Sequence, residues 1–113
     1  MVNITRRLAG MPDLLKEDIS IANHSTETLC KSLGQHGYQL VDTPMLELTE
    51  LFLRKSGGGL ASQMYTFVEP GGERVSLRPE FTAAIIRMFL ERSEKEVFPL
   101  RWQYAGPVFR YLP

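Results

Sequence analysis

The chain has 113 residues, of which 43% are hydrophobic and 23% charged, a composition that excludes a disordered chain or a fibrous repeat. Its 13 basic residues balance 13 acidic ones, which excludes a basic domain that holds nucleic acid through bulk charge. Cys30 is the only cysteine, so an intrachain disulfide and a cysteine metal site are excluded. No apolar stretch approaches the roughly 20 residues of a membrane helix, and the N-terminus lacks a signal-peptide pattern. We expect one soluble, cytoplasmic domain over residues 1–113.

The length also sets an expectation for the core. Scaling rules give a folded surface of roughly 6,300 Å² against about 18,700 Å² for the unfolded chain. A complete domain of this size therefore buries about two-thirds of its surface.

The first half of the chain predicts a long helix, a strand and a short helix. The long helix covers residues 14–35, with Asp13 as its N-cap and Gly34 and Gly37 as stop signals. Its apolar stripe recurs at helical spacing and consists of Ile19, Ala22, Thr26, Leu29 and Leu33. Alternation over residues 38–42 predicts a strand, and leucines at helical spacing over residues 46–55 predict the short helix. Residues 56–59 predict a flexible glycine loop.

The second half predicts a hairpin, a buried helix and further strands. Residues 64–68 and 74–77 flank a glycine-containing turn and predict the hairpin. Pro79 is suited to the first turn of a helix that is apolar almost all round as far as Leu90. Residues 100–104 and 108–111 predict two more strand segments. The fold class we expect is α+β with an antiparallel sheet.

Few side chains in this sequence suggest chemistry by themselves. Phosphate-loop and nucleophile-elbow patterns are absent, and His24 and His36 lie about 120° apart on the predicted helix, so we expect no metal site. Nine of the basic residues are arginines, which favours recognition of carboxylate or phosphate.

Four charged residues near the predicted hairpin and buried helix are more informative: Arg78, Glu80, Arg87 and Arg110. Glu80 is suited either to cap the following helix or to pair with an ammonium group of a ligand. Arg87 lies among apolar residues, where a structural ion pair is the better interpretation. Arg110 is either a surface residue of a sheet or an anion ligand on it.

These residues occur within a series of motifs that resembles one family. The motifs lie in order at residues 10–15 (GMPDLL), 43–47 (TPMLE), 52–57 (FLRKSG), 64–67 (MYTF), 77–82 (LRPEFT) and 104–110 (YAGPVFR). Together they resemble the class II aminoacyl-tRNA synthetase core, specifically the histidyl-tRNA synthetase family. The resemblance covers nearly the whole chain and implies the N-terminal part of an antiparallel active-site sheet flanked by helices.

The resemblance also implies roles for individual residues. Glu80 and Thr82 would bind the α-amino group of histidine. Arg110 would be the catalytic arginine of motif 2, which binds the α-phosphate of ATP and the amino acid carboxylate. Since the reaction joins two anions, a fixed guanidinium there is chemically reasonable. Pro44 would lie at the interface of a homodimer, and the full-length family uses ATP with Mg²⁺, although we expect neither to bind this chain tightly.

Two positions depart from the family pattern. Phe81 replaces a glycine beside the amino-acid pocket, and Leu112 replaces an acidic residue of motif 2. The chain also ends inside motif 2, and motif 3 and the main tRNA-binding regions of the family are not in these 113 residues. We therefore expect a single truncated core domain that does not aminoacylate tRNA alone.

Two alternatives remain open at this point. One is the paralogous regulatory subunit of ATP phosphoribosyltransferase, in histidine biosynthesis, which shares these motifs but tends to carry aspartate at the position of Glu80. The other is a stand-alone dimerisation module that binds no small molecule.

Overall fold

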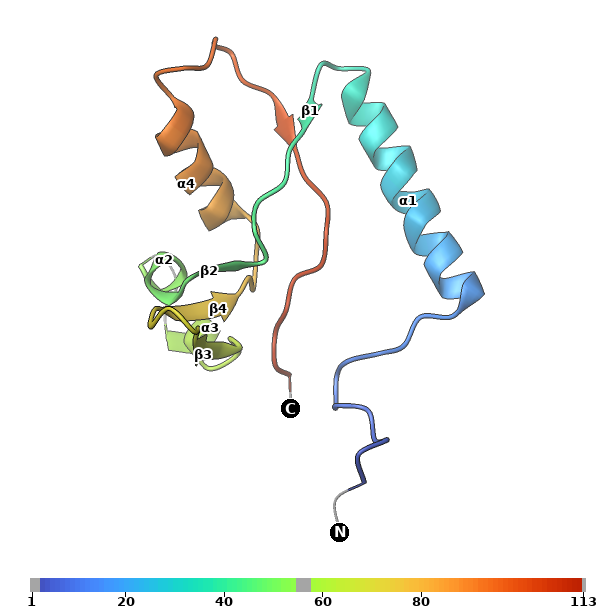
Figure 1. The fold of residues 1–113 in the computed structure, drawn as a ribbon. Helices are drawn as coiled ribbons and strands as arrows, with labels where there is room; N and C mark the ends of the chain where they lie inside the picture. The colour runs from blue at the N-terminus through green and yellow to red at the C-terminus, as the bar shows by residue number, and fades with distance from the viewer. Residues whose placement is uncertain (1–2, 55–57, 113) are drawn as a thin grey trace.

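The computed structural model describes residues 3–54 and 58–112. In chain order its elements are α1 (Lys16–Gly34), β1 (Gln39–Leu40), β2 (Leu46–Leu48), α2 (Thr49–Leu53), α3 (Gly58–Ala61), β3 (Thr66–Val68), β4 (Arg74–Leu77), α4 (Thr82–Arg92) and β5 (Trp102–Gln103). Helix α1 lies to one side of the molecule, and the short β1–β5 pair separates it from the remaining elements (Figure 1). The mixed helix and strand composition confirms the predicted fold class.

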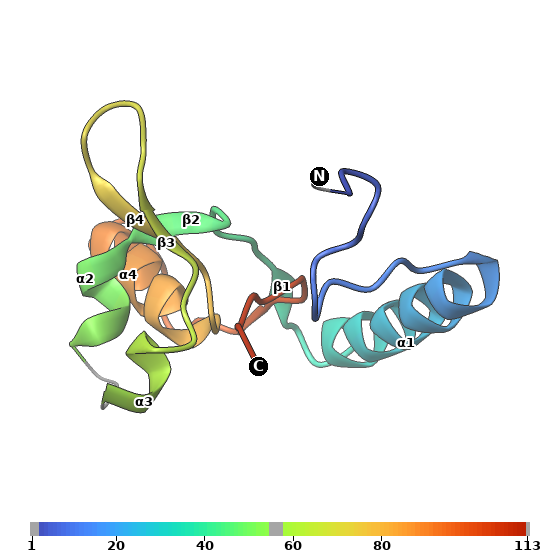
Figure 2. The same cartoon turned by 90° about the horizontal axis from the view of Figure 1, so that it is seen from below.

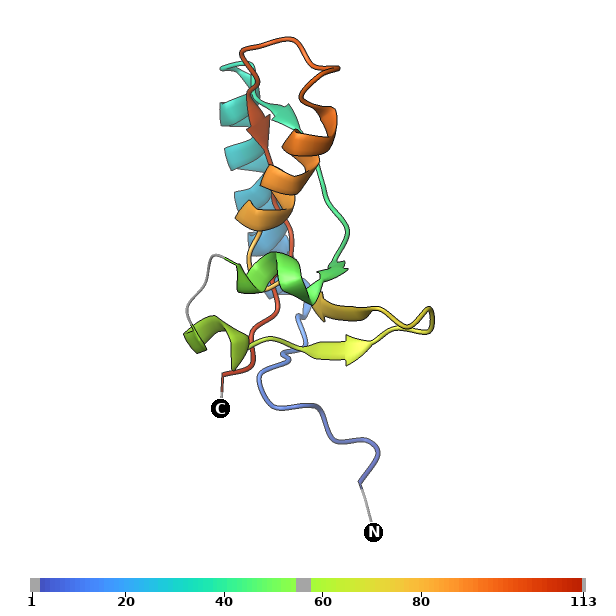
Figure 3. The same cartoon turned by 90° about the vertical axis from the view of Figure 1, so that its left-hand side faces the viewer.

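A three-stranded antiparallel sheet forms the centre of the larger part. Strand β4 lies between β2 and β3, with Ser76 opposite both Glu47 and Thr66. The predicted hairpin is confirmed, and its turn projects away from the helices (Figure 3). Strands β1 and β5 pair in parallel as a separate two-stranded sheet, a pairing that the sequence did not indicate.

The core is small and lies between this sheet and helices α2 and α4. Its buried apolar side chains are Phe52, Val75, Ala83 and Ala84. Ser76 is also fully buried, and its hydroxyl lies 2.9 Å from that of Thr49 and 2.8 Å from that of Thr66. These hydrogen bonds join β3, β4 and α2, and they satisfy a buried hydroxyl group that needs partners.

Helix α1 ends as predicted but begins later. Gly37 has a φ of +81°, and across it the Tyr38 N–H donates to the Leu33 carbonyl, a glycine termination typical of helix ends. The prediction of Asp13 as N-cap is wrong, because Leu15 is extended and the helix starts at Lys16, too far for the Asp13 carboxylate. Glu17 and Asp18 still place negative charge in the first turn.

Three other predictions need correction. Residues 46–48 form β2 rather than the start of a helix, because ladder pairing with β4 overrides the leucine spacing. Gly58 and Gly59 belong to α3, not to a loop, whereas Ser56 and Gly57 lie outside the described residues. Residues 108–111 form no strand, although the Phe109 and Tyr111 amides donate to the Arg78 and Gln63 carbonyls.

The molecule is extended, and much of its apolar surface is exposed. Its radius of gyration is 17.1 Å, against about 13 Å for a compact domain of this length. Its exposed surface of 8967 Å² exceeds the expected value by about 2,700 Å², so roughly half of the unfolded surface is buried rather than two-thirds. Helix α1 has no buried residue, and only Ala83 and Ala84 are buried in α4, which corrects the prediction of a largely buried helix. Figure 2 shows α1 well apart from the other helices.

Candidate functional site

The turn between β4 and α4 carries the predicted histidine-binding residues. Pro79 is buried in this turn, and the half-buried Glu80 follows it. The Ala83 N–H donates to both Glu80 carboxylate oxygens, at 3.2 and 3.3 Å, so Glu80 caps the N-terminus of α4. Of the two roles expected for Glu80, capping is the one that these hydrogen bonds support, and they hold the carboxylate at the helix end. Thr82, the first residue of α4, is exposed beside it.

Arg110 is held against the same turn. Its Nε donates to the Pro79 carbonyl at 2.8 Å, one residue before Glu80. The Phe109 N–H donates to the Arg78 carbonyl at 2.9 Å, which fixes the backbone just ahead of Arg110. Among residues 3–54 and 58–112, no ion pair joins Arg110 to Glu80. The turn therefore carries the Glu80 carboxylate and binds the Arg110 guanidinium, and the two groups form no ion pair.

Arg78 stabilises this turn through its buried side chain. Its side chain is 1% exposed, and it donates from Nε to the Pro107 carbonyl and from Nη1 to the Thr43 carbonyl. Phe81, at the position where the family pattern has glycine, places its ring 4.1 Å from the Arg78 guanidinium carbon. The Phe81 ring also stacks on Tyr104, with centroids 5.1 Å apart. The added bulk of Phe81 thus packs on Arg78 and Tyr104.

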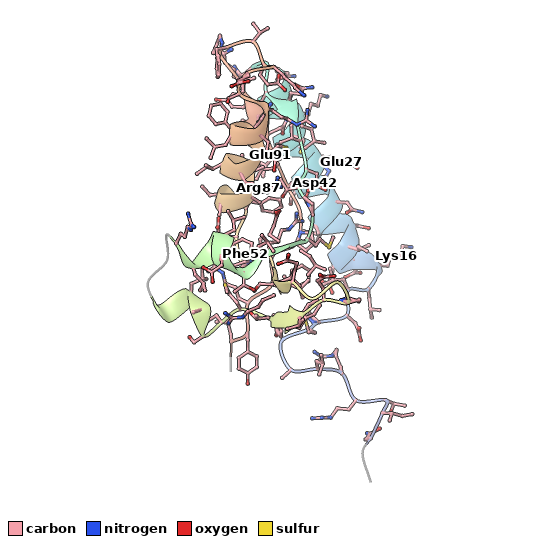
Figure 4. The ribbon with its side chains drawn as sticks, turned by 60° about the vertical axis from the view of Figure 1, so that its left-hand side comes forward. Lys16, Glu27, Asp42, Phe52, Arg87 and Glu91 are labelled. Atoms are coloured by element: carbon pink, nitrogen blue, oxygen red, sulfur yellow. The ribbon has the colours of Figure 1, made fainter. Side chains whose placement is uncertain are left out.

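Arg87 forms the predicted structural ion pair. Its guanidinium lies 2.8 Å from a Glu47 oxygen on β2 and 3.0 Å from a Glu91 oxygen one helical turn along α4. Figure 4 shows Arg87 and Glu91 side by side on α4. Desolvation lowers the pKa of Arg87, but the hydrogen bonds and charges of Glu47 and Glu91 raise it overall. Arg87 therefore stays charged and ties α4 to the sheet.

Other predicted features lie apart from this turn. Pro44 is exposed in the segment between β1 and β2, next to Thr43, whose carbonyl accepts from Arg78. Within the described part of the chain, no three His, Cys, Asp or Glu side chains lie together as a metal site. None of the described helices is long and apolar enough to cross a membrane.

The family assignment follows from comparison with known proteins. The sequence pattern of the histidyl-tRNA synthetase family matches residues 10–113. The chain belongs to this family. The histidine–tRNA ligase of Rickettsia prowazekii is 37% identical over 114 residues, covering 98% of this chain and 28% of that protein. The corresponding ligase of Methanoregula boonei is 37% identical over 102 residues, covering 90% of this chain and 25% of that protein.

Solved structures agree with membership of the histidyl-tRNA synthetase family. The apo histidyl-tRNA synthetase of S. aureus superposes with a TM-score of 0.78 at 32% identity, covering 98% of this chain and 30% of that one. A structure from Bacillus halodurans, described as an ATP phosphoribosyltransferase regulatory subunit/histidyl-tRNA synthetase, gives a TM-score of 0.85 at 25% identity over 97% of this chain. The present chain covers 29% of the Bacillus halodurans protein chain. The present chain thus spans between a quarter and a third of these relatives.

Sequence reasoning singled out Arg78 but gave it no role. An arginine between Leu77 and Pro79, at the end of an apolar strand, was a signal for a buried and bonded side chain. Gly106 was missed as well. A Cβ there would lie 2.6 Å from Arg78 Nη2, so a side chain at this position would have to displace the guanidinium. Its position in the YAGPVFR motif was the available signal.

Proposed function

We propose that this chain forms the histidine- and ATP-binding part of a histidine–tRNA ligase core, in which histidyl-adenylate is made before transfer to tRNA. The observation that carries the proposal is the hydrogen bond from Arg110 to Pro79, because it holds a cation against the turn that carries the Glu80 carboxylate, with no ion pair between the two. A zwitterionic amino acid and a nucleotide phosphate need both charges.

Glu80 and Arg110 bind different groups of the two ligands. The Glu80 carboxylate and the Thr82 hydroxyl accept hydrogen bonds from the α-amino group of histidine. Arg110 keeps its terminal nitrogens for the α-phosphate of ATP and for the histidine carboxylate, which attacks that phosphate directly. Mg²⁺ usually reaches such sites on the nucleotide phosphates.

The histidine contact is tested by calorimetry on the whole chain. Glu80→Gln should weaken histidine binding about 10- to 100-fold, because a hydrogen bond to a charged group contributes roughly 1.5–3 kcal/mol. The exposed Glu94 provides the matched control, since Glu94→Gln should leave the affinity unchanged. Imidazolepropionate, which lacks the α-amino group, should bind the parent and Glu80→Gln equally. If Glu80→Gln lost its affinity for this analogue as well, Glu80 would not be the residue that contacts the α-amino group.

The regulatory subunit of ATP phosphoribosyltransferase is the second candidate, because the Bacillus halodurans structure, whose description names both functions, superposes with a TM-score of 0.85. Glu80 favours the synthetase instead, because the regulatory family tends to have aspartate there. Titration with Mg·ATP separates the two functions. The synthetase function predicts ATP binding that Arg110→Ala abolishes, whereas the regulatory function predicts histidine binding with no ATP binding that depends on Arg110.

We also propose that the chain assembles as a homodimer through α1 and the segment that contains Pro44. Support comes from the exposed apolar side chains of these two segments, among them Leu29, Met45 and Leu46. The excess exposed surface of about 2,700 Å² is large enough to include a stable interface. Sedimentation should give twice 12.9 kDa, or about 26 kDa. Met45→Glu should produce a monomer, and Val97→Glu, at an equally apolar exposed site, should not.

A further inference from the structure

The most completely bonded side chain at the site is one to which neither the family roles nor the proposed function assigns a task. Arg78 directly follows β4 and has a side chain that is 1% exposed, although arginine is rarely buried without partners. Its ion-pair partner Asp42 has a side chain that is 73% exposed, so the pair is asymmetric. The Arg78 charge is therefore compensated mainly by backbone carbonyls.

These carbonyls come from two segments that are distant in sequence. Nε donates to the Pro107 carbonyl at 2.8 Å, and Nη1 donates to the Thr43 carbonyl at 3.0 Å and the Asp42 carboxylate at 3.3 Å. The forked guanidinium is suited to such divergent bonds because its donors are held in one plane. One side chain thus joins the segment after β1 to the segment after β5.

The Arg78 backbone makes the same connection. Its N–H donates to the Met45 carbonyl and its carbonyl accepts from the Phe109 N–H, both at 2.9 Å. The Phe81 ring covers one side of the guanidinium, and Gly106 allows the chain to pass directly over Nη2. Bonds at Pro107 and Phe109 leave the residue that follows, Arg110, little freedom to move.

We infer that Arg78 is a positioning residue that fixes where Arg110 lies relative to Glu80. Arg78 touches neither ligand, and it acts by holding residues 107–109 against the turn that carries Glu80. The part of this inference that concerns ATP rests on the proposed function. The part that concerns the position of Arg110 does not depend on the proposed function. Loss of the Arg78 fork releases Arg110 even though the Arg110 side chain is unchanged.

Arginine side-chain NMR on the labelled full chain tests the geometry directly. Among the described residues, the arginines that donate through Nε are Arg78, Arg87 and Arg110, so each gives a protected Nε–H signal. In Arg78→Met, the Arg110 Nε–H should exchange with water at least about tenfold faster, as expected when a tertiary hydrogen bond opens. Arg87→Met is the matched control, because it removes another arginine that is bonded through Nε from the same folded unit. An unchanged Arg110 signal in Arg78→Met, or an equal change in both variants, overturns the inference.

A second variant covers the case in which Arg78→Met fails to fold. Gly106→Ala keeps the Arg78 charge but puts a Cβ 2.6 Å from Nη2 and 3.1 Å from the Phe81 ring, which displaces the guanidinium. It should release the Arg110 signal in the same way, and Arg78→Lys, which has no fork, should not restore it. Retention of the parent signal in both Gly106→Ala and Arg78→Lys contradicts the inference.

Titration with Mg·ATP separates this inference from the proposed function. Arg78→Met should lose at least about tenfold in ATP affinity, as Arg110→Ala does, with Arg87→Met unchanged. A general loss of stability would weaken ATP binding in Arg87→Met as well. Absence of ATP binding in the parent chain overturns the proposed function, while the Arg110 signal alone decides whether Arg78 positions that residue.

Discussion

Strand β4 and helix α1 lie at opposite extremes of burial in this chain. Strand β4 is paired on both edges and contains the buried Val75 and Ser76, whereas α1 has 19 residues and none of them is buried. The sequence pattern predicted both elements, but only β4 buries apolar side chains within this chain. The comparison teaches that the free energy of folding comes mainly from the unit of sheet, α2 and α4, whereas the apolar stripe of α1 stays exposed within this chain.

The largest expected effect concerns the core of the unit. Phe52 is 1% exposed and Leu29 on α1 is 65% exposed. Phe52→Ala should lower the free energy of unfolding by about 3–5 kcal/mol, because it leaves a cavity. Leu29→Ala should change it by less than about 0.5 kcal/mol in the monomer. Urea denaturation measures both, and similar losses for the two variants would refute the division into a stable unit and an unsupported helix.

An intermediate effect is expected from the ion pair that ties α4 to the sheet. The Glu47 side chain is 8% exposed and binds the Arg87 guanidinium, so Glu47→Gln should lower the free energy of unfolding by about 1–3 kcal/mol. Glu27, exposed on α1, gives the control, and Glu27→Gln should stay within about 0.5 kcal/mol of the parent. Thermal unfolding of the two variants, Glu47→Gln and Glu27→Gln, shows whether the ion pair stabilises the fold more than an exposed glutamate does.

The smallest effect belongs to the turn between β3 and β4. The Gly71 and Glu73 amides donate to the Glu69 carboxylate and lower its pKa below the ordinary value of about 4.3. Because the folded pKa is the lower one, this carboxylate stabilises the turn above the ordinary pKa, and the contribution is lost as pH falls through the folded pKa. The Gly71 amide signal should therefore shift with an apparent pKa below that of a free glutamate. Glu69→Gln should abolish the shift, and a midpoint at or above the free value would contradict the assignment.

Predictions from sequence succeeded where local chemistry decides the structure. Gly37 ended α1, the glycine turn produced the hairpin, and Glu80 capped α4 because each depends on residues a few positions apart. The predicted site residues Glu80 and Arg110 came from motif order, and only the structure shows that Arg110 is bonded to the turn that carries Glu80.

Predictions failed where distant residues decide. Residues 46–48 became a strand because β4 offered a ladder, and the parallel β1–β5 pair joins segments with no local signal. Arg78 was noticed without a role, since its partners at Thr43 and Pro107 are 35 and 29 residues away. Likewise, helical periodicity identified an apolar face on α1 but not whether anything within the chain covers it.

The β1–β5 pair has a consequence for the order in which the chain acquires its structure. Gln103 on β5 donates to the carbonyl of Tyr38, 65 residues earlier, and to that of Cys30 in α1. Contacts between such distant positions form late, because the entropy of closing a long loop is lost before they contribute. During synthesis α1 is made before the hairpin and α4, but it is fixed in place after them, because β5 is made last. We therefore expect the hairpin and α4 to assemble before β5 emerges from the ribosome and binds α1.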